Sequence, residues 1–373
     1  MGRLVIYVHD LRTSGVVRDS LHLAAHCAGH HQVTLVAGYG TGFLQDQAGG
    51  AGYEVHRLHD GRTRGFARVI VAPALRRWLH RQGPCVLISM GNMGHATPYL
   101  ASRGMRHVRR IYRISNEVAR GDGLRGWLRR NWMQRLIDDA ARLPRVGAAL
   151  AANPLFAPAL QQGIAVEMSS GVDIQRAQQM ALAPAPHPWL ADKIPVVLGI
   201  GRLRPQKNFG LLIDAVALLR KRQHVRLVII GGGTPSESRA LAERAARAGL
   251  ADEFLLAGET RNVFCWLARS RVFVLPSRWE GSSVALLEAM AVGTPVVASM
   301  LAGDAPQVLD GGRHGRLFDG ISASALADAI ALQLSEQVVR PGERAQSYAE
   351  PWRAYRALIE QVQNVSDEPL SGP

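Results

Sequence analysis

The sequence predicts an α/β protein made of two doubly wound parallel-sheet domains. Short apolar runs alternate with longer helical patterns along most of the chain, which is typical of βαβ units. The alternation occurs twice, on either side of a proline-dense stretch, and 373 residues suffice for two domains of ordinary size. We therefore expect a first domain at 1–180, a linker at 181–195 and a second domain at 196–350.

Each half is expected to supply its own strands and helices. In the first half the apolar runs predict strands at Leu4–Val8, Val33–Ala37, Glu54–Leu58, Cys85–Ser89, Val108–Ile114 and Val146–Ala151. The helical patterns between them are most evident at Val16–Ala28, Phe66–Arg81 and Leu124–Arg142. In the second half strands are expected at Val196–Ile200, Arg226–Ile230, Glu253–Leu256, Val272–Leu275 and Pro295–Ala298, and a last helical pattern covers Pro351–Val365.

The composition is that of a globular protein, with 47% hydrophobic and 20% charged residues. Cys27, Cys85 and Cys265 are scattered and odd in number, so they favour a reducing compartment over a disulfide framework or a metal site. The N-terminus turns polar too quickly for a signal peptide, and no apolar stretch approaches the roughly 18–20 residues that span a bilayer. We expect a cytoplasmic protein, or one peripheral to the inner face of the plasma membrane.

Positive charge is concentrated in the first half of the chain. The net charge is +14; residues 1–180 hold 23 Arg, no Lys and 11 acidic residues, whereas residues 181–373 hold 21 basic and 19 acidic residues. Such asymmetry indicates an anionic partner for the first domain. Nucleic acid, an anionic membrane surface and a phosphorylated acceptor stay open, as does a compositional bias toward arginine.

The segment Ser277–Met290 carries the strongest functional signal. The helical stretch from Ser283 to Val292 is apolar on every face except at Glu288. An ionised carboxylate in such surroundings needs hydrogen-bond donors, since burying it alone costs several kcal/mol or more. A sugar hydroxyl pair of a bound nucleotide is one candidate donor, and an arginine elsewhere in the chain is the alternative. Glu280 lies just before this helix, with seven residues between the two acids.

A second candidate motif follows the first strand of the second half. Ligands of open α/β sheets bind where a parallel strand leads through a loop into a helix. The loop Gly201–Asn208 occupies such a place, and its Arg202 and Lys207 suit a diphosphate, although two solvated loop cations would give the same pattern. Asn208 is expected to cap the helix Phe209–Arg222. The run Gly231–Gly233 also follows a strand, but tight strand-to-helix turns recruit glycine without any ligand.

These motifs resemble those of the retaining glycosyltransferases of family 4, which have the two-domain GT-B fold. The Glu280-to-Glu288 spacing is similar to the family's E-x7-E signature, and Gly201–Asn208 to its G-R-L-x-x-x-K-N motif. The resemblance implies that Glu288 holds the ribose hydroxyls of a nucleotide sugar and that Glu280 faces the transferred sugar. It further implies a catalytic role for Arg202, Lys207 and Glu280, and donor contacts by Gly15, Gly201, Gly232, Gly281, Ser282, Ser283 and Glu288.

The same resemblance implies that the two domains face a cleft, that a C-terminal helix within about 351–373 returns to the first domain, and that this domain binds the acceptor. His95 and Asn116 are the acceptor-side candidates, although a lone histidine is more often structural. Many relatives carry a histidine near position 116, and an amide there cannot exchange a proton near pH 7. Likewise Gln307 stands where relatives often have a glutamate.

The chemistry expected from the resemblance needs no cofactor beyond the nucleotide-sugar co-substrate, with a UDP-sugar favoured. The departing phosphate takes the acceptor's proton on the face that it leaves, so the protein mainly stabilises charge on the diphosphate. No Asp-x-Asp segment is present, and Asp138-Asp139 lies in a helical pattern that indicates a solvated face. We therefore expect no metal site.

The leading hypothesis is transfer of a hexosyl or N-acetylhexosaminyl group to a lipid-linked or glycan acceptor in lipopolysaccharide, capsule or exopolysaccharide assembly. The partners expected are the donor, the acceptor and an anionic membrane surface reached by the Arg-rich helices Phe66–Arg81 and Leu124–Arg142. One alternative is a GT-B protein that binds nucleotide sugars without transfer. The other is a basic nucleic-acid-binding protein; since no zinc spacing, RNP-like aromatic pattern or basic-region heptad is present, we expect no nucleic acid.

Overall fold

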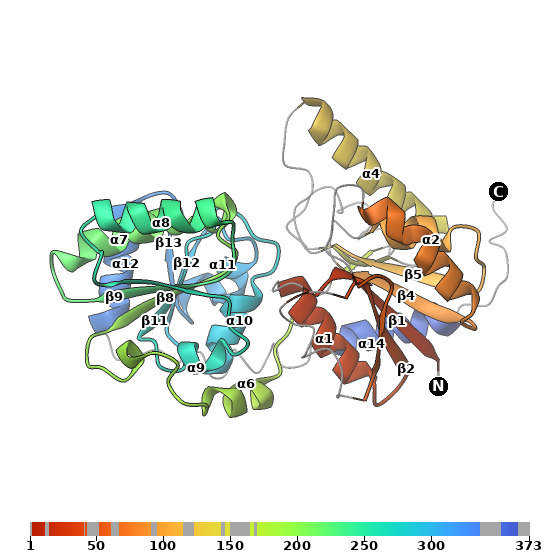
Figure 1. The fold of residues 1–373 in the computed structure, drawn as a ribbon, viewed down its shortest axis with the longest axis horizontal. Coiled ribbons are helices and arrows are strands. Elements are labelled where there is room, and N and C mark those ends of the chain that lie inside the picture. Colours follow the sequence, from red (N-terminus) through yellow and green to blue (C-terminus); the bar gives the residue numbers. More distant parts are fainter. Residues whose placement is uncertain are drawn as a thin grey trace. The chain divides into compact units, whose positions relative to one another are not determined.

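The computed structural model describes residues 2–11, 15–40, 42, 52–60, 67–90, 95–114, 123–142, 146–149, 165–167, 170–335 and 352–364. The chain divides into two compact units (Figure 1). Unit 1 comprises residues 1–12, 16–169 and 351–373, and unit 2 comprises residues 13–15 and 170–350. Each is a parallel sheet covered by helices on both faces, so the predicted fold class is confirmed.

Unit 1 is built on a five-stranded sheet with the order β3-β2-β1-β4-β5. The strands are β1 (Arg3–Asp10), β2 (Gln32–Tyr39), β3 (Glu54–Arg57), β4 (Cys85–Met90) and β5 (Val108–Arg113), and all neighbours pair in parallel. The central strand β1 is buried from Leu4 to Val8 because helices cover both of its faces, which explains its continuous apolar run. A separate parallel pair joins β6 (Val146–Ala149) and β7 (Ala165–Glu167); β7 was not expected from the sequence.

Five described helices belong to unit 1: α1 (Gly15–Cys27), α2 (Ala67–His80), α3 (Ala96–Ser102), α4 (Gly123–Arg142) and α14 (Trp352–Asn364). Helices α1 and α14 contribute side chains to one apolar cluster beside the sheet. Helices α2 and α3 contribute to a cluster on the other face. The doubly wound arrangement thus follows from apolar faces that must be buried on each side of one sheet.

The C-terminal helix α14 packs into unit 1, as predicted. Its apolar residues Leu358, Ile359 and Val362 are buried in the cluster that also holds α1. A buried polar network adds to this contact: Arg113 at the end of β5 forms an ion pair of 2.6 Å with Asp19 of α1 and hydrogen-bonds the hydroxyl of Tyr355 in α14. Since a buried charge is stable only with a partner, each of these three side chains helps to hold the helix in place.

Unit 2 contains a six-stranded parallel sheet with the order β10-β9-β8-β11-β12-β13. The strands are β8 (Val196–Ile200), β9 (Arg226–Ile230), β10 (Phe254–Gly258), β11 (Val272–Leu275), β12 (Val296–Ser299) and β13 (Arg316–Phe318). Strand β13 pairs with β12 and was not expected from the sequence. A three-residue edge strand leaves too short a pattern to recognise without its partner.

Helices cover both faces of the second sheet (Figure 1). One apolar cluster joins the sheet to α7 (Phe209–Arg220), α8 (Pro235–Arg247) and α12 (Ala323–Ser335). The cluster on the other face includes α6 (Ile174–Ala181), α9 (Phe264–Leu267), α10 (Val284–Ala291) and α11 (Ala305–Val308). Three short 3-10 helices complete the described part of the unit: η2 (Pro188–Leu190), η3 (Pro205–Lys207) and η4 (Asp310–Gly312).

The proline-dense segment 181–195 is packed into unit 2, where the sequence analysis expected a linker. Leu190 is buried in a core cluster of this unit, and the guanidinium carbon of Arg226 lies 5.0 Å from the Trp189 ring centroid. Unit 2 also includes residues 170–180, which the sequence analysis assigned to the first domain. The prolines therefore shape a surface turn of the second unit, because its apolar residues find a core to enter.

No helix in the described ranges is both long enough and apolar enough to cross a membrane.

Candidate functional site

The loops that follow β8 and β11 meet at the carboxyl edge of the second sheet. Lys207, in η3, places its Nζ 2.5 Å from Oε1 of Glu280. The Ser277 hydroxyl donates to the same oxygen over 2.6 Å, and Nε2 of Gln206 donates to Oε2 over 3.3 Å. The Glu280 side chain is only 6% exposed, so these donors compensate for the loss of water. Because β8 and β11 are neighbours, the structure brings two predicted catalytic residues together.

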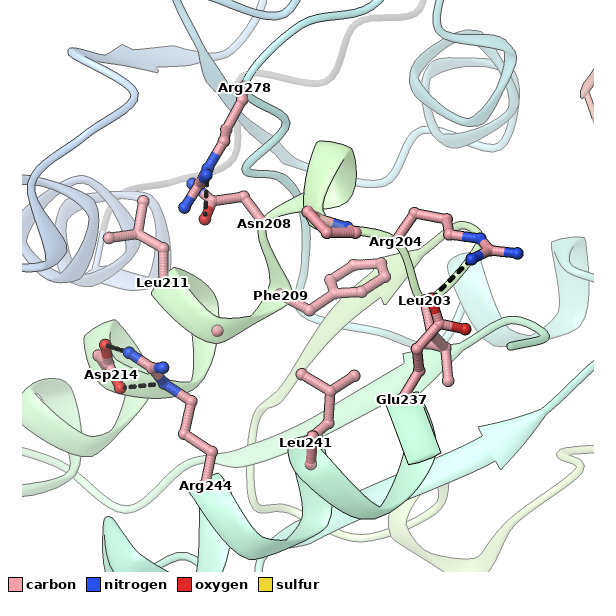
Figure 2. A pocket seen from close by; sticks show the side chains of 13 residues that line it. Leu203, Arg204, Asn208, Phe209, Leu211, Asp214, Glu237, Leu241, Arg244 and Arg278 are labelled. Atoms are coloured by element: carbon pink, nitrogen blue, oxygen red, sulfur yellow. Dashed lines mark hydrogen bonds and ion pairs between the residues drawn. The ribbon is translucent and has the colours of Figure 1, made fainter. Parts of the chain in front are cut away.

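Further hydrogen bonds join the η3 turn to the Ser277–Gly281 loop. The backbone N–H of Arg278 donates to the Gln206 carbonyl over 2.9 Å, and the Gln206 side chain donates to the Trp279 carbonyl over 2.9 Å. Asn208 joins this contact by accepting a hydrogen bond from Nε of Arg278 over 3.3 Å (Figure 2). The turn and the loop therefore form one connected structure around Glu280.

The expectation that Asn208 caps α7 was wrong for its side chain. Asn208 stands at the N-cap position, but its backbone is left-handed, with φ of 54° and ψ of 35°, and its side chain makes no capping hydrogen bond. Capping requires an extended backbone that turns the side chain toward the first helical N–H groups. In the left-handed region the same amide is directed to Arg278 instead.

Two glycines of the predicted motifs allow close approach between backbones. A Cβ on Gly231, which has φ of +155°, would lie 1.8 Å from the carbonyl oxygen of Gly201. The loops after β8 and β9 are also joined by a 3.0 Å hydrogen bond from the N–H of Leu203 to the carbonyl of Gly232. At Gly232 a Cβ would lie 2.8 Å from the Glu259 carboxyl group. Tight packing therefore accounts for glycine at these positions, and donor contacts by Gly201 and Gly232 stay predictions.

Arg202 differs from the other cations of this loop. Its side chain is exposed and, within the part of the chain that the structure describes, has no hydrogen-bond or ion-pair partner. By contrast Arg204, two residues later, forms a 3.0 Å ion pair with Glu237 of α8. Arg202 thus keeps a planar set of donors that no described carboxylate neutralises, which suits an anionic ligand.

Helix α10 begins beside this loop, with Ser283 at its N-cap, and agrees with the helix predicted from Ser283 to Val292. Glu288 lies about one turn after Val284, the first residue of α10, and is 1% exposed, among the buried residues of this helix. Gly281 is buried and Ser282 half-buried just before the N-cap. The free N–H groups and the dipole of the helix N-terminus favour negative charge in front of it. The donor role of these residues stays a prediction.

Asp304, which the sequence analysis missed, belongs to this site. It follows β12, and its Oδ1 accepts a 3.4 Å hydrogen bond from the backbone N–H of Ser283. Burial, and then the negative charge of Glu280, raise the pKa of Asp304 to about 6, although contacts from Ser282 and Ser283 oppose the rise. One feature of the sequence could have indicated this residue: it is an acidic residue in the loop after a predicted parallel strand, and ligands of such sheets bind at that end of the strands.

A pocket of about 330 Å³ lies against other residues of the same loop, between α7 and α8 (Figure 2). Leu203, Phe209 and Leu241 form its apolar wall. The ion pairs Arg204–Glu237 and Arg244–Asp214 stand at its sides, with Arg278 above them in this view. None of the predicted site residues lines it, so the pocket is separate from the Lys207–Glu280 pair.

The acceptor-side candidates lie in unit 1. His95 precedes α3 and is fully buried, with its Nδ1 2.6 Å from the Ser89 hydroxyl and its ring in a T-shaped contact with the ring of Tyr112. Burial lowers the pKa of His95 to about 3, so the ring is neutral at physiological pH. Asn116 lies outside the described residues, and an acceptor role for His95 and Asn116 stays a prediction. Gly15, for which a donor contact was predicted, begins α1 and is assigned to unit 2; its donor role also stays a prediction.

In the described ranges, no three His, Cys, Asp or Glu side chains are grouped as ligands of a metal ion. Metal independence itself stays a prediction, because a reaction can also recruit a cation through its substrate.

Comparison with known proteins gives matches over both the second unit and the whole fold. Residues 194–336 match the family model described as "Glycosyl transferases group 1". The lipopolysaccharide core biosynthesis mannosyltransferase LpsB of Rhizobium meliloti is 36% identical over 142 residues, which cover 37% of this chain and 40% of that protein. A GDP-mannose-dependent phosphatidylinositol monomannoside mannosyltransferase of Mycobacterium tuberculosis is 34% identical over 147 residues, or 37% of each chain.

The chain therefore spans about two fifths of the length of these two relatives. Among solved structures, Anabaena HepE in complex with UDP and glucose superimposes with a TM-score of 0.77 at 16% identity, over 98% of this chain and 100% of HepE. At that identity the likeness establishes the fold alone. The GT-B fold expected from the sequence motifs is thereby confirmed.

Proposed function

We propose that this chain, whose residues 194–336 match the family model of the group 1 glycosyltransferases, transfers a glycosyl group from a nucleotide sugar with retention of configuration. The match agrees with the glycosyltransferase family that the sequence motifs resemble. We propose that the donor binds to unit 2, at the edge where Lys207, Glu280 and α10 lie. The acceptor proposed is a lipid-linked or glycan molecule of cell-surface polysaccharide assembly.

The Lys207–Glu280 contact supports this proposal most directly. It places a cation and an acid side by side at the carboxyl ends of β8 and β11, where open α/β sheets bind ligands. The Lys207 side chain is 16% exposed, so its ammonium is largely shielded from water. Electrostatic attraction is stronger in such surroundings than in bulk water. A diphosphate arriving beside Lys207 and Arg202 would find one cation already ordered and another without a described carboxylate partner.

The proposed reaction breaks the bond between the anomeric carbon and the donor's β-phosphate oxygen. A bond then forms between the same carbon and the acceptor oxygen on the same face, and the acceptor's proton passes to the departing phosphate oxygen. Negative charge accumulates on the diphosphate as it leaves, and we propose that Arg202 and Lys207 stabilise that charge. Glu280 would face the transferred sugar and Glu288 the ribose hydroxyls.

The base and the sugar of the donor are the least determined part of this proposal. The resemblance of the sequence motifs favours a UDP-sugar, and HepE was solved in complex with UDP and glucose. However, LpsB is named a mannosyltransferase and the mycobacterial relative a GDP-mannose-dependent one. We propose a hexosyl donor and treat UDP-hexoses and GDP-mannose as the two classes that an experiment must separate.

A peripheral membrane location is proposed from helix α4. Trp127 and Leu128 are 54% and 53% exposed, and Arg130 on the same helix is also exposed. Exposed aromatic and aliphatic side chains beside arginines suit the headgroup region of anionic lipid. Flotation with liposomes that contain or lack anionic lipid tests this, with Trp127→Ala as the variant. Equal recovery of the protein on both liposome types would contradict it.

Donor binding is tested first, by thermal shift with UDP-, GDP- and ADP-hexoses. We expect stabilisation by one base class, followed by release of the matching nucleoside diphosphate when a lipopolysaccharide core or polyprenyl-linked acceptor is added. No stabilisation by any nucleotide sugar would overturn the proposal. Binding without transfer to any acceptor would favour the alternative of a nucleotide-sugar-binding protein without transfer activity. Binding of oligonucleotides alone would favour the basic nucleic-acid-binding alternative.

A further inference from the structure

The side chain of Asp304 contacts the start of α10, although its position would suit a capping hydrogen bond to its own helix, α11. It stands at the N-cap position of α11, yet its side chain makes no capping hydrogen bond there. Its Oδ1 instead accepts the N–H of Ser283, which is the N-cap residue of α10. The Ser283 side chain makes no capping hydrogen bond either. The Asp304 carboxylate at the start of α11 thus accepts a hydrogen bond from the backbone at the start of α10.

The turn that carries Asp304 is held tightly against the loop before α10. Gly303 has φ of +59°, and a Cβ there would lie 2.5 Å from the carbonyl oxygen of Glu280 and 2.7 Å from that of Gly281. Such distances exclude any larger residue unless the backbone moves. Asp304 therefore directly follows a close backbone contact between its own turn and the loop that carries Glu280.

The surroundings of Asp304 are otherwise poor in compensating charge. Among the described residues, the ionisable group that faces it is Glu280, with the polar groups of Ser282 and Ser283 on the same loop. Glu280 is itself paired with Lys207, which limits its repulsion of Asp304. Burial and this like charge raise the pKa of Asp304 to about 6, within the range that a pH titration of the protein can cover.

We propose that Asp304 is a positioning residue for the donor loop, which its carboxylate holds by accepting the Ser283 N–H at the first turn of α10. This inference rests on the proposed function and extends it to a residue that neither motif contains. Because α10 carries Glu288, a shift of its first turn would displace both the loop amides and the acid proposed to bind the ribose. Protonation weakens the acceptor, so donor binding should weaken as the pH falls through the range in which Asp304 titrates.

The test compares Asp304→Ala, Asp304→Asn and the control Asp310→Asn. Asp310 is an exposed acid in η4 that forms a 3.0 Å ion pair with Arg313. Amide hydrogen exchange of the segment 281–291 is measured without donor, and donor KM and kcat are measured from pH 5 to 8. Asp304→Ala removes a hydrogen bond to a charged group. We therefore expect amide exchange in 281–291 to become about tenfold faster and the donor KM to rise about tenfold, whereas kcat should change less.

The amide of Asp304→Asn keeps a neutral acceptor, so this variant should recover part of the loss at pH 7. It should also remove the rise of wild-type KM below about pH 6. Asp310→Asn should behave as wild type. Unchanged exchange and unchanged KM in Asp304→Ala would overturn the inference, as would an Asp304→Asn pH profile identical to that of wild type.

The two readouts separate this inference from the proposed function. If exchange in 281–291 rises in Asp304→Ala but wild type binds no nucleotide sugar, Asp304 positions the loop and the proposed donor is wrong. If wild type and Asp304→Ala bind the donor equally well, the positioning role is wrong and the proposed function stands. A nucleotide sugar named by the thermal-shift panel serves as the donor probe in both cases.

Discussion

Lys207 and Glu280 form an ion pair of 2.5 Å although they stand 73 positions apart in the chain. Their side chains are 16% and 6% exposed, so most of the water around both charges has been removed. The pair depends on the adjacency of β8 and β11 in the sheet, and on the Gln206 hydrogen bonds that join the two loops. A diphosphate would compete with Glu280 for the ammonium group, so donor binding and this ion pair should be linked.

Lys207→Ala is expected to weaken donor binding and to lower turnover. The substitution removes charge compensation for the diphosphate and leaves Glu280 without its cation. We therefore expect kcat/KM to fall about 10- to 100-fold, which corresponds to about 2 kcal/mol. The measurement is steady-state donor kinetics, with Lys221→Ala as the control because Lys221 is exposed at the end of α7. Wild-type kinetics in Lys207→Ala would remove this lysine from the site.

Glu288→Gln is expected to raise donor KM more than it lowers kcat. Glu288 is 1% exposed, and a neutral amide is a weaker acceptor for ribose hydroxyls than a carboxylate. Nucleoside diphosphate binding, measured by calorimetry, should weaken by about tenfold. The matched control is Glu243→Gln, whose side chain is 57% exposed on α8. The affinity lost on Glu288→Gln should be smaller for a donor with deoxyribose than for the donor with ribose. Equal losses for the two donors would contradict a ribose contact.

Chelation is expected to leave transfer unchanged. The proposed mechanism assigns charge stabilisation to Arg202 and Lys207, so activity assayed in excess EDTA should equal activity in magnesium. The control is a known magnesium-dependent glycosyltransferase assayed in parallel. A requirement for a divalent cation that returns on adding magnesium or manganese would contradict the mechanism.

Tyr355→Phe is expected to loosen the C-terminal helix. The substitution keeps the ring but removes the hydroxyl that hydrogen-bonds Arg113, a buried interaction with a charged group that should stabilise unit 1 by about 2 kcal/mol. Hydrogen exchange in α14 should accelerate, and the thermal unfolding midpoint should fall. Tyr99→Phe serves as the control, since Tyr99 is half-buried and stacks edge-on with Trp132. Equal exchange in both variants would show that apolar packing alone holds the helix.

Asp304 is expected to make stability depend on pH. Its pKa is raised from 3.8 to about 6 in the folded protein, so the folded state binds more protons than the unfolded state between these values. The stabilising effect of protonation is complete below about pH 4 and is lost as the pH rises through about 6, by at most about 3 kcal/mol. Asp304→Asn should therefore gain stability relative to wild type between pH 4 and pH 7. Parallel melting curves against pH would contradict this.

Much of the fold could be predicted from local patterns. The predicted bounds of β8, β9 and β11 equal the observed ones because each is a buried strand whose apolar run ends at polar or turn residues. The apolar pattern did not predict the edge strand β13. The prolines of 181–195 indicated a linker, whereas this segment packs into unit 2. In both places the outcome depends on a partner distant in sequence, namely β12 for the strand and the unit 2 core for Leu190.

By itself, the sequence determined the chemical types at the candidate site and their local geometry. The spacing of Glu280 and Glu288 around a helix start, and the placement of Arg202 and Lys207 after a strand, follow from periodicities within a few residues. Only the tertiary structure decided which of these groups touch. The order of strands paired Lys207 with Glu280, the turn after β12 brought Asp304 to Ser283, and the left-handed backbone of Asn208 turned its side chain toward Arg278. Such contacts join segments far apart in the chain, so their energies depend on the assembled sheet and leave no periodic trace in the sequence.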